Sequence, residues 1–153
     1  MLSALLLCLV VGISDGDTLT ARCKIERAST TIKVRLAEID APEKSQRFGR
    51  RSKQHLSEIC FRKTAEVRPV ATDSYGRTVA HVRCGATDAS GEQVRAGMAW
   101  VFTRYAPRSS ALPQVELDAR SARRGLWIDR NPVAPWEWRI ADHDQVERRV
   151  RSD

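Results

Sequence analysis

The chain contains the stretch Lys33-Val34-Arg35-Leu36-Ala37-Glu38-Ile39-Asp40-Ala41-Pro42-Glu43, in which a strand pattern runs into a group of charged residues. Val34 and Leu36 alternate onto one face of the predicted strand, so Arg35 points to the other face. Pro42 fixes its own φ and pushes the residue before it towards an extended conformation, so we expect the strand to end there. The charged side chains would then be held at the open end of a strand.

Three residues of this stretch, Arg35, Asp40 and Glu43, carry groups that suit the hydrolysis of a phosphodiester. The planar fork of an arginine matches phosphate oxygens. An aspartate is a hard oxygen ligand for Ca²⁺ or Mg²⁺, and a glutamate can orient or deprotonate a water molecule. Any two of them could equally form a surface salt bridge without chemistry. The three together favour a catalytic site.

The sequence before this stretch predicts a hairpin with carboxylates in its turn. Val10–Ser14 is expected to be a strand that runs into the sharp turn Asp15-Gly16-Asp17-Thr18, and Leu19–Ile25 is expected to be the next strand. Asp17 then lies one hairpin away from Asp40. Adjacent antiparallel strands could bring these two carboxylates together, and such a pair favours a bound cation.

The sequence after residue 43 predicts further strands and helices. We expect strands over residues 31–39, 64–70 and 78–84, and helices over residues 48–60, 92–99 and 112–124. Gly125 is expected to cap the last of these helices at its C-terminus. Arg77 begins a strand beside the glycine turn Asp73-Ser74-Tyr75-Gly76-Arg77, which makes it a second candidate to clamp a phosphate, although a single arginine of this kind is commonly a solvated charge.

The order of these elements predicts the fold class. Strands, a helix, two more strands and then further helices fit an α+β, mainly β fold: a five-stranded Greek-key barrel of the OB type with about three helices. Pro132–Trp138 is expected to form an irregular clasp in which the tryptophans pack, and the charged tail over residues 141–153 is expected to fray or protrude. OB barrels commonly bind oligonucleotides on a strand face.

Composition favours one basic domain. The 153 residues include 26 Lys and Arg against 19 Asp and Glu, which gives a net charge of +7 and favours a polyanionic partner. We place the domain at residues 11–140, between an apolar segment over residues 1–14 and the tail over residues 141–153.

The apolar run over residues 1–11 allows two interpretations. It is too short to span a bilayer as a helix, and its length fits the apolar part of a signal peptide, although no Lys or Arg precedes it. A cut at the small-residue pair Gly12 and Ser14 would leave Asp15 as the new N-terminus. The other interpretation is a buried first strand. Both stay open, with export to the periplasm or the medium slightly preferred over a cytoplasmic location; no stable membrane partner is expected.

The cysteines do not follow a metal-binding pattern. The chain has four cysteines without a Cys-x-x-Cys pair, and its three histidines are scattered, so a zinc site is not expected. Cys60 closes the first predicted helix and Cys84 ends a strand that should pack beneath it. An exported protein could join these two in a disulfide and leave Cys23 free, whereas in the cytosol all would be buried thiols.

Five motifs in the same order give the chain a resemblance to a known family. They are Asp15-Gly16-Asp17-Thr18, Val34-Arg35-Leu36 with Ile39-Asp40-Ala41-Pro42-Glu43, Asp73-Ser74-Tyr75-Gly76-Arg77, Val94-Arg95-Ala96-Gly97-Met98-Ala99 and Arg124-Gly125-Leu126-Trp127. The sequence resembles the staphylococcal nuclease (thermonuclease) family over residues 11–138. The resemblance implies an OB barrel and the Ca²⁺-dependent hydrolysis of DNA and RNA with little sequence specificity.

The resemblance also implies a role for each matching residue. Asp17 and Asp40 would be carboxylate ligands of one Ca²⁺ ion. The carbonyl of Ala41 would be a third ligand, at a position where many relatives carry threonine. Glu43 would orient or deprotonate the attacking water.

The substrate would be held by arginines and tyrosines. By the same resemblance, Arg35 and Arg77 would clamp the phosphate, and Tyr75 and Tyr105 match positions that line the nucleotide pocket. Thr103 stands where some relatives carry a second pocket tyrosine. The expected substrates are DNA and RNA in single-stranded or unpaired regions, and the protein is expected to be a monomer.

A binding module is the competing interpretation. A catalytically silent OB barrel could hold single-stranded nucleic acid without cutting it, because a fold alone does not settle function. Such a module has no reason to retain the complete set of charged residues, which is Asp17, Arg35, Asp40, Glu43 and Arg77. Their joint presence favours the enzyme.

Overall fold

The computed structural model describes residues 4–152, apart from the side chain of Tyr105. Five strands form a closed barrel: β1 (Leu6–Asp15), β2 (Thr18–Ile25), β3 (Ala28–Leu36), β5 (Thr64–Thr72) and β6 (Thr78–Cys84). Neighbouring strands pair antiparallel in the order β3-β2-β1-β5-β6, and a parallel pairing of β3 with β6 closes the barrel. The predicted five-stranded barrel of the OB type is therefore confirmed.

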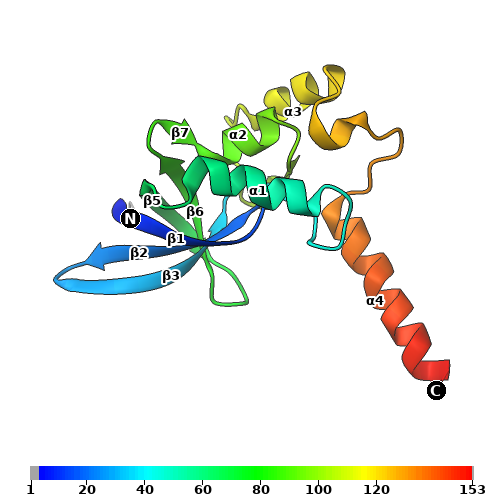
Figure 1. Ribbon diagram of the computed structural model, residues 1–153, viewed down its shortest axis with the longest axis horizontal. Coiled ribbons are helices and arrows are strands. Elements are labelled where there is room, and N and C mark those ends of the chain that lie inside the picture. The colour runs from blue at the N-terminus through cyan, green and yellow to red at the C-terminus, as the bar shows by residue number, and fades with distance from the viewer. Residues whose placement is uncertain (1–3, 153) are drawn as a thin grey trace.

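Short strands and helices surround this barrel (Figure 1). The short strands are β4 (Ile39–Asp40), which pairs with β8 (Trp100–Val101), and β7 (Thr87–Asp88), which pairs antiparallel with the end of β6. The helices are α1 (Gly49–Cys60), α2 (Ala89–Arg95), α3 (Leu112–Ser121) and α4 (Pro135–Ser152), with 3-10 turns η1 (Thr103–Tyr105) and η2 (Gly125–Ile128). Helix α1 crosses the barrel, α2 and α3 lie together beyond it, and α4 projects away from the body.

The core fills the barrel and continues beneath α1. Alternate residues of the strands point inward, as Val10, Leu19 and Val34 do, and Leu56 of α1 joins them with no exposed surface. This alternation is the period-2 pattern that the sequence shows, so burial of apolar area explains where these strands form.

Two disulfides join parts of this core. Cys60 at the end of α1 is bonded to Cys84 at the end of β6. Cys8 is bonded to Cys23 at directly paired positions of β1 and β2. The second bond corrects the expectation that Cys23 would be free.

The third strand begins and ends three residues earlier than the sequence pattern predicts. β3 ends at Leu36 rather than at Ile39, because Glu38 adopts a positive φ of 69° that breaks the strand. The chain resumes as the two-residue strand β4, which pairs with β8 instead of continuing in the barrel. The break turns Asp40 towards the open end of the barrel.

The C-terminal part also differs from the prediction. The expected irregular clasp is the start of α4, because Pro135 suits the first position of a helix, where its missing N–H costs nothing. The tail, which was expected to fray or protrude, continues this helix to Ser152 and protrudes (Figure 1). Gly125 does not cap α3, which ends at Ser121; its positive φ of 52° lets the chain pass close to Gly97, whose carbonyl accepts a hydrogen bond from Leu126 N–H.

The apolar N-terminal run lies largely in β1. Residues 1–3 of that run are outside the described residues, and from Leu6 onward it pairs with β2 and β5. A cut that leaves Asp15 as the N-terminus would remove nearly all of this strand. Within residues 4–152, no helix is both long and apolar enough to cross a membrane.

Candidate active site

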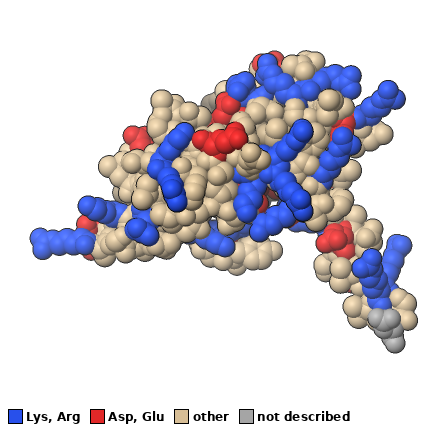
Figure 2. Space-filling view, viewed as in Figure 1, with Lys and Arg blue, Asp and Glu red and all other residues tan. Residues whose placement is uncertain are grey.

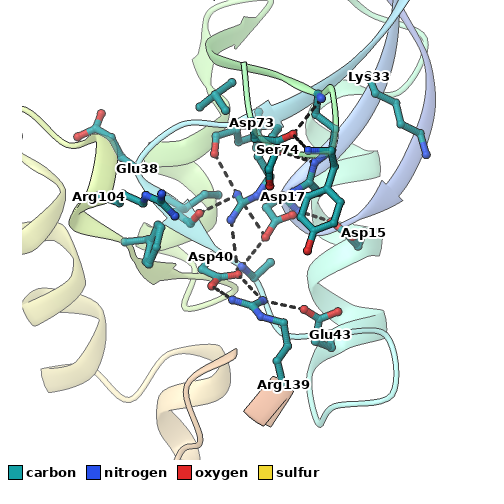
Figure 3. Close-up of a pocket in the computed structure, with 18 of the residues that line it drawn as sticks. Asp15, Asp17, Lys33, Glu38, Asp40, Glu43, Asp73, Ser74, Arg104 and Arg139 are labelled. Carbon is teal, nitrogen blue, oxygen red and sulfur yellow. Dashed lines mark hydrogen bonds and ion pairs between the residues drawn. The ribbon is translucent and has the colours of Figure 1, made fainter. Parts of the chain in front are cut away.

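A pocket of about 800 Å³ opens at the end of the barrel where β3 stops. Its walls come from the β1–β2 turn, the segment from β3 through β4, the β5–β6 loop and the first part of α4 (Figure 3). It collects every sequence-predicted site residue whose side chain the structure describes, namely Asp17, Arg35, Asp40, Ala41, Glu43, Tyr75 and Arg77.

Arg35 lies at the centre of the pocket and joins its two buried aspartates. Its Nη1 is 3.4 Å from Oδ2 of Asp17, and its Nη2 is 3.5 Å from Oδ1 of Asp40. Nη1 also donates to the carbonyl of Ile39 at 2.7 Å and to that of Leu36 at 3.1 Å. The side chain is 15% exposed, so packing and hydrogen bonds fix the guanidinium with one edge towards the pocket.

The β1–β2 turn places Asp15 and Asp17 beside each other. Burial, followed by the charge and hydrogen bond of Asp17, raises the pKa of Asp15 to about 7. Burial acts in the same direction on Asp17, but the charge of Arg35 and hydrogen bonds from Asp15, Ala41 and Thr18 outweigh it and lower the pKa of Asp17. Asp17 is therefore the carboxylate of this turn that stays ionised.

A buried glutamine of α2 holds the β1–β2 turn through a hydrogen bond to its backbone. Gln93 of α2 has no exposed surface, and its Nε2 donates to the carbonyl of Gly16 at 2.7 Å and to that of Ser52 at 3.0 Å. A Cβ on Gly16 would lie 1.7 Å from Oγ of Ser52, so only glycine fits between the two aspartates. Helices α1 and α2 thus hold the turn that carries Asp17.

Asp40 and Glu43 share one partner from the far end of the chain. Arg139 of α4 donates from Nη2 to Oδ2 of Asp40 at 2.6 Å, and from Nη1 to Oδ1 of Asp40 at 3.2 Å and to Oε1 of Glu43 at 2.7 Å. Figure 3 shows Arg139 pointing into the pocket between these two carboxylates. Burial raises the pKa of Asp40, although the hydrogen bonds from Arg139 act against this shift.

Arg77 enters the pocket from the β5–β6 loop and is oriented by Asp73. Its Nε donates to Oδ2 of Asp73 at 2.7 Å, and its Nη1 lies 3.5 Å from the hydroxyl of Thr18. The guanidinium lies 5.3 Å from the ring centre of Tyr75. The pKa of Asp73 is lowered: burial raises it, but hydrogen bonds from the backbone and side chain of Arg77 outweigh this effect. The tyrosine ring is 84% exposed and stands at the pocket rim.

The pocket offers oxygen donors of the kind that a hard divalent cation requires. Six carboxylates line it, and ion pairs with the guanidinium groups of Arg35, Arg77 and Arg139 offset part of their charge. They are those of Asp15, Asp17, Glu38, Asp40, Glu43 and Asp73. Within the described residues, however, no three His, Cys, Asp or Glu side chains gather closely enough to hold a metal ion by themselves. The donors fit Ca²⁺ in kind, and backbone, substrate or solvent oxygens would have to complete the coordination.

The sequence analysis missed Arg139, Asp73 and Asp15 as members of this pocket. Arg139 lies 96 positions after Glu43, directly after the segment expected to be an irregular clasp, so spacing offered no sign of it. Asp73 was quoted only as part of a turn, yet it orients Arg77. Of the predicted residues, Tyr105 ends η1, and its side chain lies outside the described part of the structure.

The face of the molecule that carries α1 is rich in basic side chains. Figure 2 shows Lys and Arg side chains spread over the face that carries α1, from the β2–β3 hairpin to α4, with few acidic side chains among them. This distribution agrees with the net charge of +7 and would attract a polyanion to the molecule.

Comparisons with known proteins agree on one family. Residues 33–129 match the family model described as staphylococcal nuclease homologue. The chain is 44% identical over 132 residues to a protein of Haemophilus influenzae named uncharacterized endonuclease, with 86% of this chain and 72% of that protein covered. It is 39% identical over 142 residues to a micrococcal nuclease of Shigella flexneri, with 86% of this chain and 79% of that protein covered. A staphylococcal-like nuclease of Arabidopsis thaliana is 34% identical, with 83% of this chain and 39% of that protein covered.

Proposed function

The chain belongs to the staphylococcal nuclease family and is a nuclease, and from that premise we propose that it is a Ca²⁺-dependent phosphodiesterase that cleaves DNA and RNA with little sequence specificity. One observation carries the proposal. The guanidinium of Arg35 lies between the carboxylates of Asp17 and Asp40, in one pocket with Glu43 and Arg77. This combination supplies groups for a cation, a phosphate and a water molecule.

Asp17 and Asp40, with the carbonyl of Ala41, are the residues that would hold the cation. The two carboxylates are buried and share Arg35, and Oδ2 of Asp17 accepts a hydrogen bond from the N–H of Ala41 at 2.7 Å. When bound, one Ca²⁺ ion would polarise a phosphoryl oxygen and offset the charge of the diester. The hydrogen bond ties the β1–β2 turn to the segment that carries the other two ligands.

Arg35 and Arg77 are the residues that would bind the phosphate. Arg35 is held by two backbone carbonyls, and Arg77 by Asp73, so neither side chain has to be ordered when the substrate arrives. Charge grows on the phosphoryl oxygens as the water attacks, and fixed donors stabilise it by about 2.7–4 kcal/mol each. Tyr75, at the exposed rim beside Arg77, and Tyr105 are proposed to contact the nucleotide.

Glu43 is the residue that would act on the water. Its side chain is 38% exposed at the pocket edge, so solvent can reach the carboxylate. In the proposed in-line step, the water oxygen attacks phosphorus, its proton passes to Glu43, and the bond from phosphorus to the leaving oxygen breaks. A general base of this kind contributes about 10²–10⁴-fold to the rate.

The substrate is proposed to be single-stranded or unpaired DNA and RNA, bound by a monomer. An OB barrel presents a strand face to extended nucleic acid, and the exposed ring of Tyr75 is available to a base that is not paired. The basic surface shown in Figure 2 would follow the phosphates without reading sequence.

The experiment is cleavage of single-stranded DNA by the purified chain, with Ca²⁺ and separately with a chelator. Cutting with Ca²⁺ and none with chelator is the expected result. Cutting that is equal in both conditions would reject the proposed cation dependence. Binding without cutting in either condition would reject the proposed activity and identify a silent OB module, whose affinity would fall steeply with salt.

A further inference from the structure

We propose that Arg139 is a positioning residue of the catalytic pocket, which holds Glu43 beside Asp40 and competes with the cation for the oxygens of Asp40. The inference rests on the proposed roles of these two carboxylates. It adds a residue from the C-terminal helix to a site otherwise built from the barrel and its loops.

The geometry of the contact fixes both carboxylates at once. Nη1 of Arg139 donates to Asp40 at 3.2 Å and to Glu43 at 2.7 Å, while Nη2 donates to the other oxygen of Asp40 at 2.6 Å. Because a guanidinium is planar and rigid, these bonds set the position of the Glu43 carboxylate relative to Asp40. The Glu43 backbone is tied to Gln46, since its N–H donates to Oε1 of Gln46 at 3.1 Å and its carbonyl accepts from the Gln46 N–H at 2.9 Å.

The contact is stronger than an ordinary surface ion pair. The side chain of Asp40 is 2% exposed and that of Arg139 is 45% exposed, so at least one partner has lost its water. A buried carboxylate without a counter-charge is costly, and Arg139 and Arg35 are the guanidinium groups that approach Asp40. We therefore expect both oxygens of Asp40 to remain hydrogen-bonded to Arg139 until another cation replaces its charge.

The first turn of α4 is anchored so that Arg139 reaches the pocket. Ala134 is buried, and its carbonyl accepts from the N–H groups of Glu137 and Trp138. The ring of Trp136 packs 5.6 Å from that of Trp100, and Gln46 donates to the carbonyl of Val133 at 2.6 Å. Beyond Arg139 every described residue of the helix is exposed. The anchored part of α4 is therefore its first turn, which directly precedes Arg139.

The position of Arg139 predicts its effect on the cation. A divalent ion on Asp40 would lie close to a guanidinium of the same sign, and like charges at this range repel in a partly buried site. Removal of the Arg139 charge should therefore tighten Ca²⁺ binding. The same change frees the Glu43 carboxylate, so the catalytic rate should fall. A loss of folding would weaken both Ca²⁺ binding and the catalytic rate. Tighter Ca²⁺ binding together with a lower catalytic rate therefore identifies a positioning role.

The test compares Arg139→Gln with Arg139→Lys and with the matched control Arg148→Gln, which removes the same charge from an exposed position of α4. Ca²⁺ affinity is measured by calorimetry on the full chain without substrate, and kcat and KM are measured on single-stranded DNA. We expect Arg139→Gln to bind Ca²⁺ about tenfold more tightly and to lose about tenfold or more in kcat with little change in KM. Arg139→Lys should bind Ca²⁺ nearly as the unchanged protein does, and Arg148→Gln should alter neither property.

Unchanged or weaker Ca²⁺ binding in Arg139→Gln would overturn the inference, and so would an unchanged kcat. The two proposals fail separately. If the unchanged protein binds Ca²⁺ and cuts DNA while Arg139→Gln binds no tighter, the nuclease proposal stands and the role of Arg139 is rejected. If the unchanged protein cuts DNA equally well in chelator, the proposed Ca²⁺ dependence fails, and tighter Ca²⁺ binding by Arg139→Gln would still support the competition at Asp40.

Discussion

The backbone N–H of Ala41 donates a hydrogen bond of 2.7 Å to Oδ2 of Asp17, across 24 positions of sequence. The bond joins the β1–β2 turn to the residue that directly follows Asp40. Arg35 lies against the same oxygen of Asp17 at 3.4 Å. One carboxylate oxygen therefore links the two segments that supply the proposed cation ligands and the arginine between them.

The substitution Asp17→Ala should abolish this link and one cation ligand together. Arg35 would lose a partner and the cation a carboxylate, so we expect Ca²⁺ affinity to fall and cleavage to drop by about 10²-fold or more at fixed Ca²⁺. Calorimetry and initial rates on single-stranded DNA measure the two effects. Asp144→Ala, which removes an exposed carboxylate of α4, is the control and should leave both unchanged. Cleavage close to normal in Asp17→Ala would contradict the ligand assignment.

The substitution Glu43→Gln should separate catalysis from folding. The amide has the shape of the carboxylate and its oxygen can still accept from Arg139, but it cannot take a proton from water. We expect kcat to fall by about 10²–10⁴-fold while KM and the melting temperature change little. A wild-type rate in this variant would remove Glu43 from the mechanism.

The centre of the pocket was predictable because its residues are close in sequence or in neighbouring strands. Arg35 and Asp40 are five positions apart, and Asp17 sits in the turn that leads into the adjacent strand, so alternation and hairpin pairing placed them together. The positive φ of Glu38 was not predictable, because a non-glycine residue in that region is uncommon and the local sequence shows no glycine or asparagine. Although Glu38 breaks the strand, Asp40 still lies at the end of the barrel where the pocket opens.

Arg139 was not predictable for a different reason. Two prolines near residue 135 suggested an irregular segment, whereas Pro135 begins a helix of 18 residues. The contact between α4 and the pocket joins residues 96 and 99 positions apart, and it depends on tertiary packing and hydrogen bonds at the start of α4. Patterns of period 2 or 3.6 identify elements and their buried faces, but they do not reveal which distant elements meet.

The substitution Arg77→Ala should lower the rate through loss of charge in the transition state. We expect a loss of about 10²-fold or more in kcat, because a fixed donor to the phosphate is removed. Asp73→Asn tests how Arg77 is held: the Nε of Arg77 donates to Oδ2 of Asp73, and an amide keeps at most one acceptor there. We expect Asp73→Asn to show a smaller loss of kcat than Arg77→Ala. A double variant no worse than Arg77→Ala alone would show that Asp73 acts through Arg77.

The disulfides should contribute to stability without affecting the reaction. The bridges span 15 and 24 positions, and constraint of the unfolded chain by loops of this length stabilises the fold by about 3 kcal/mol each in the chain-entropy model. Both lie in the barrel and under α1, away from the residues that line the pocket. The double variant Cys60→Ala with Cys84→Ala should therefore melt about 10 °C lower, with kcat unchanged at 25 °C. Reduction of the unchanged protein opens both bridges but leaves the buried sulfur atoms in place, so it tests the bridges without a loss of packing. If reduced and oxidised protein melt together, the bridges do not stabilise the fold; if kcat falls on reduction, the barrel end that carries the pocket depends on them.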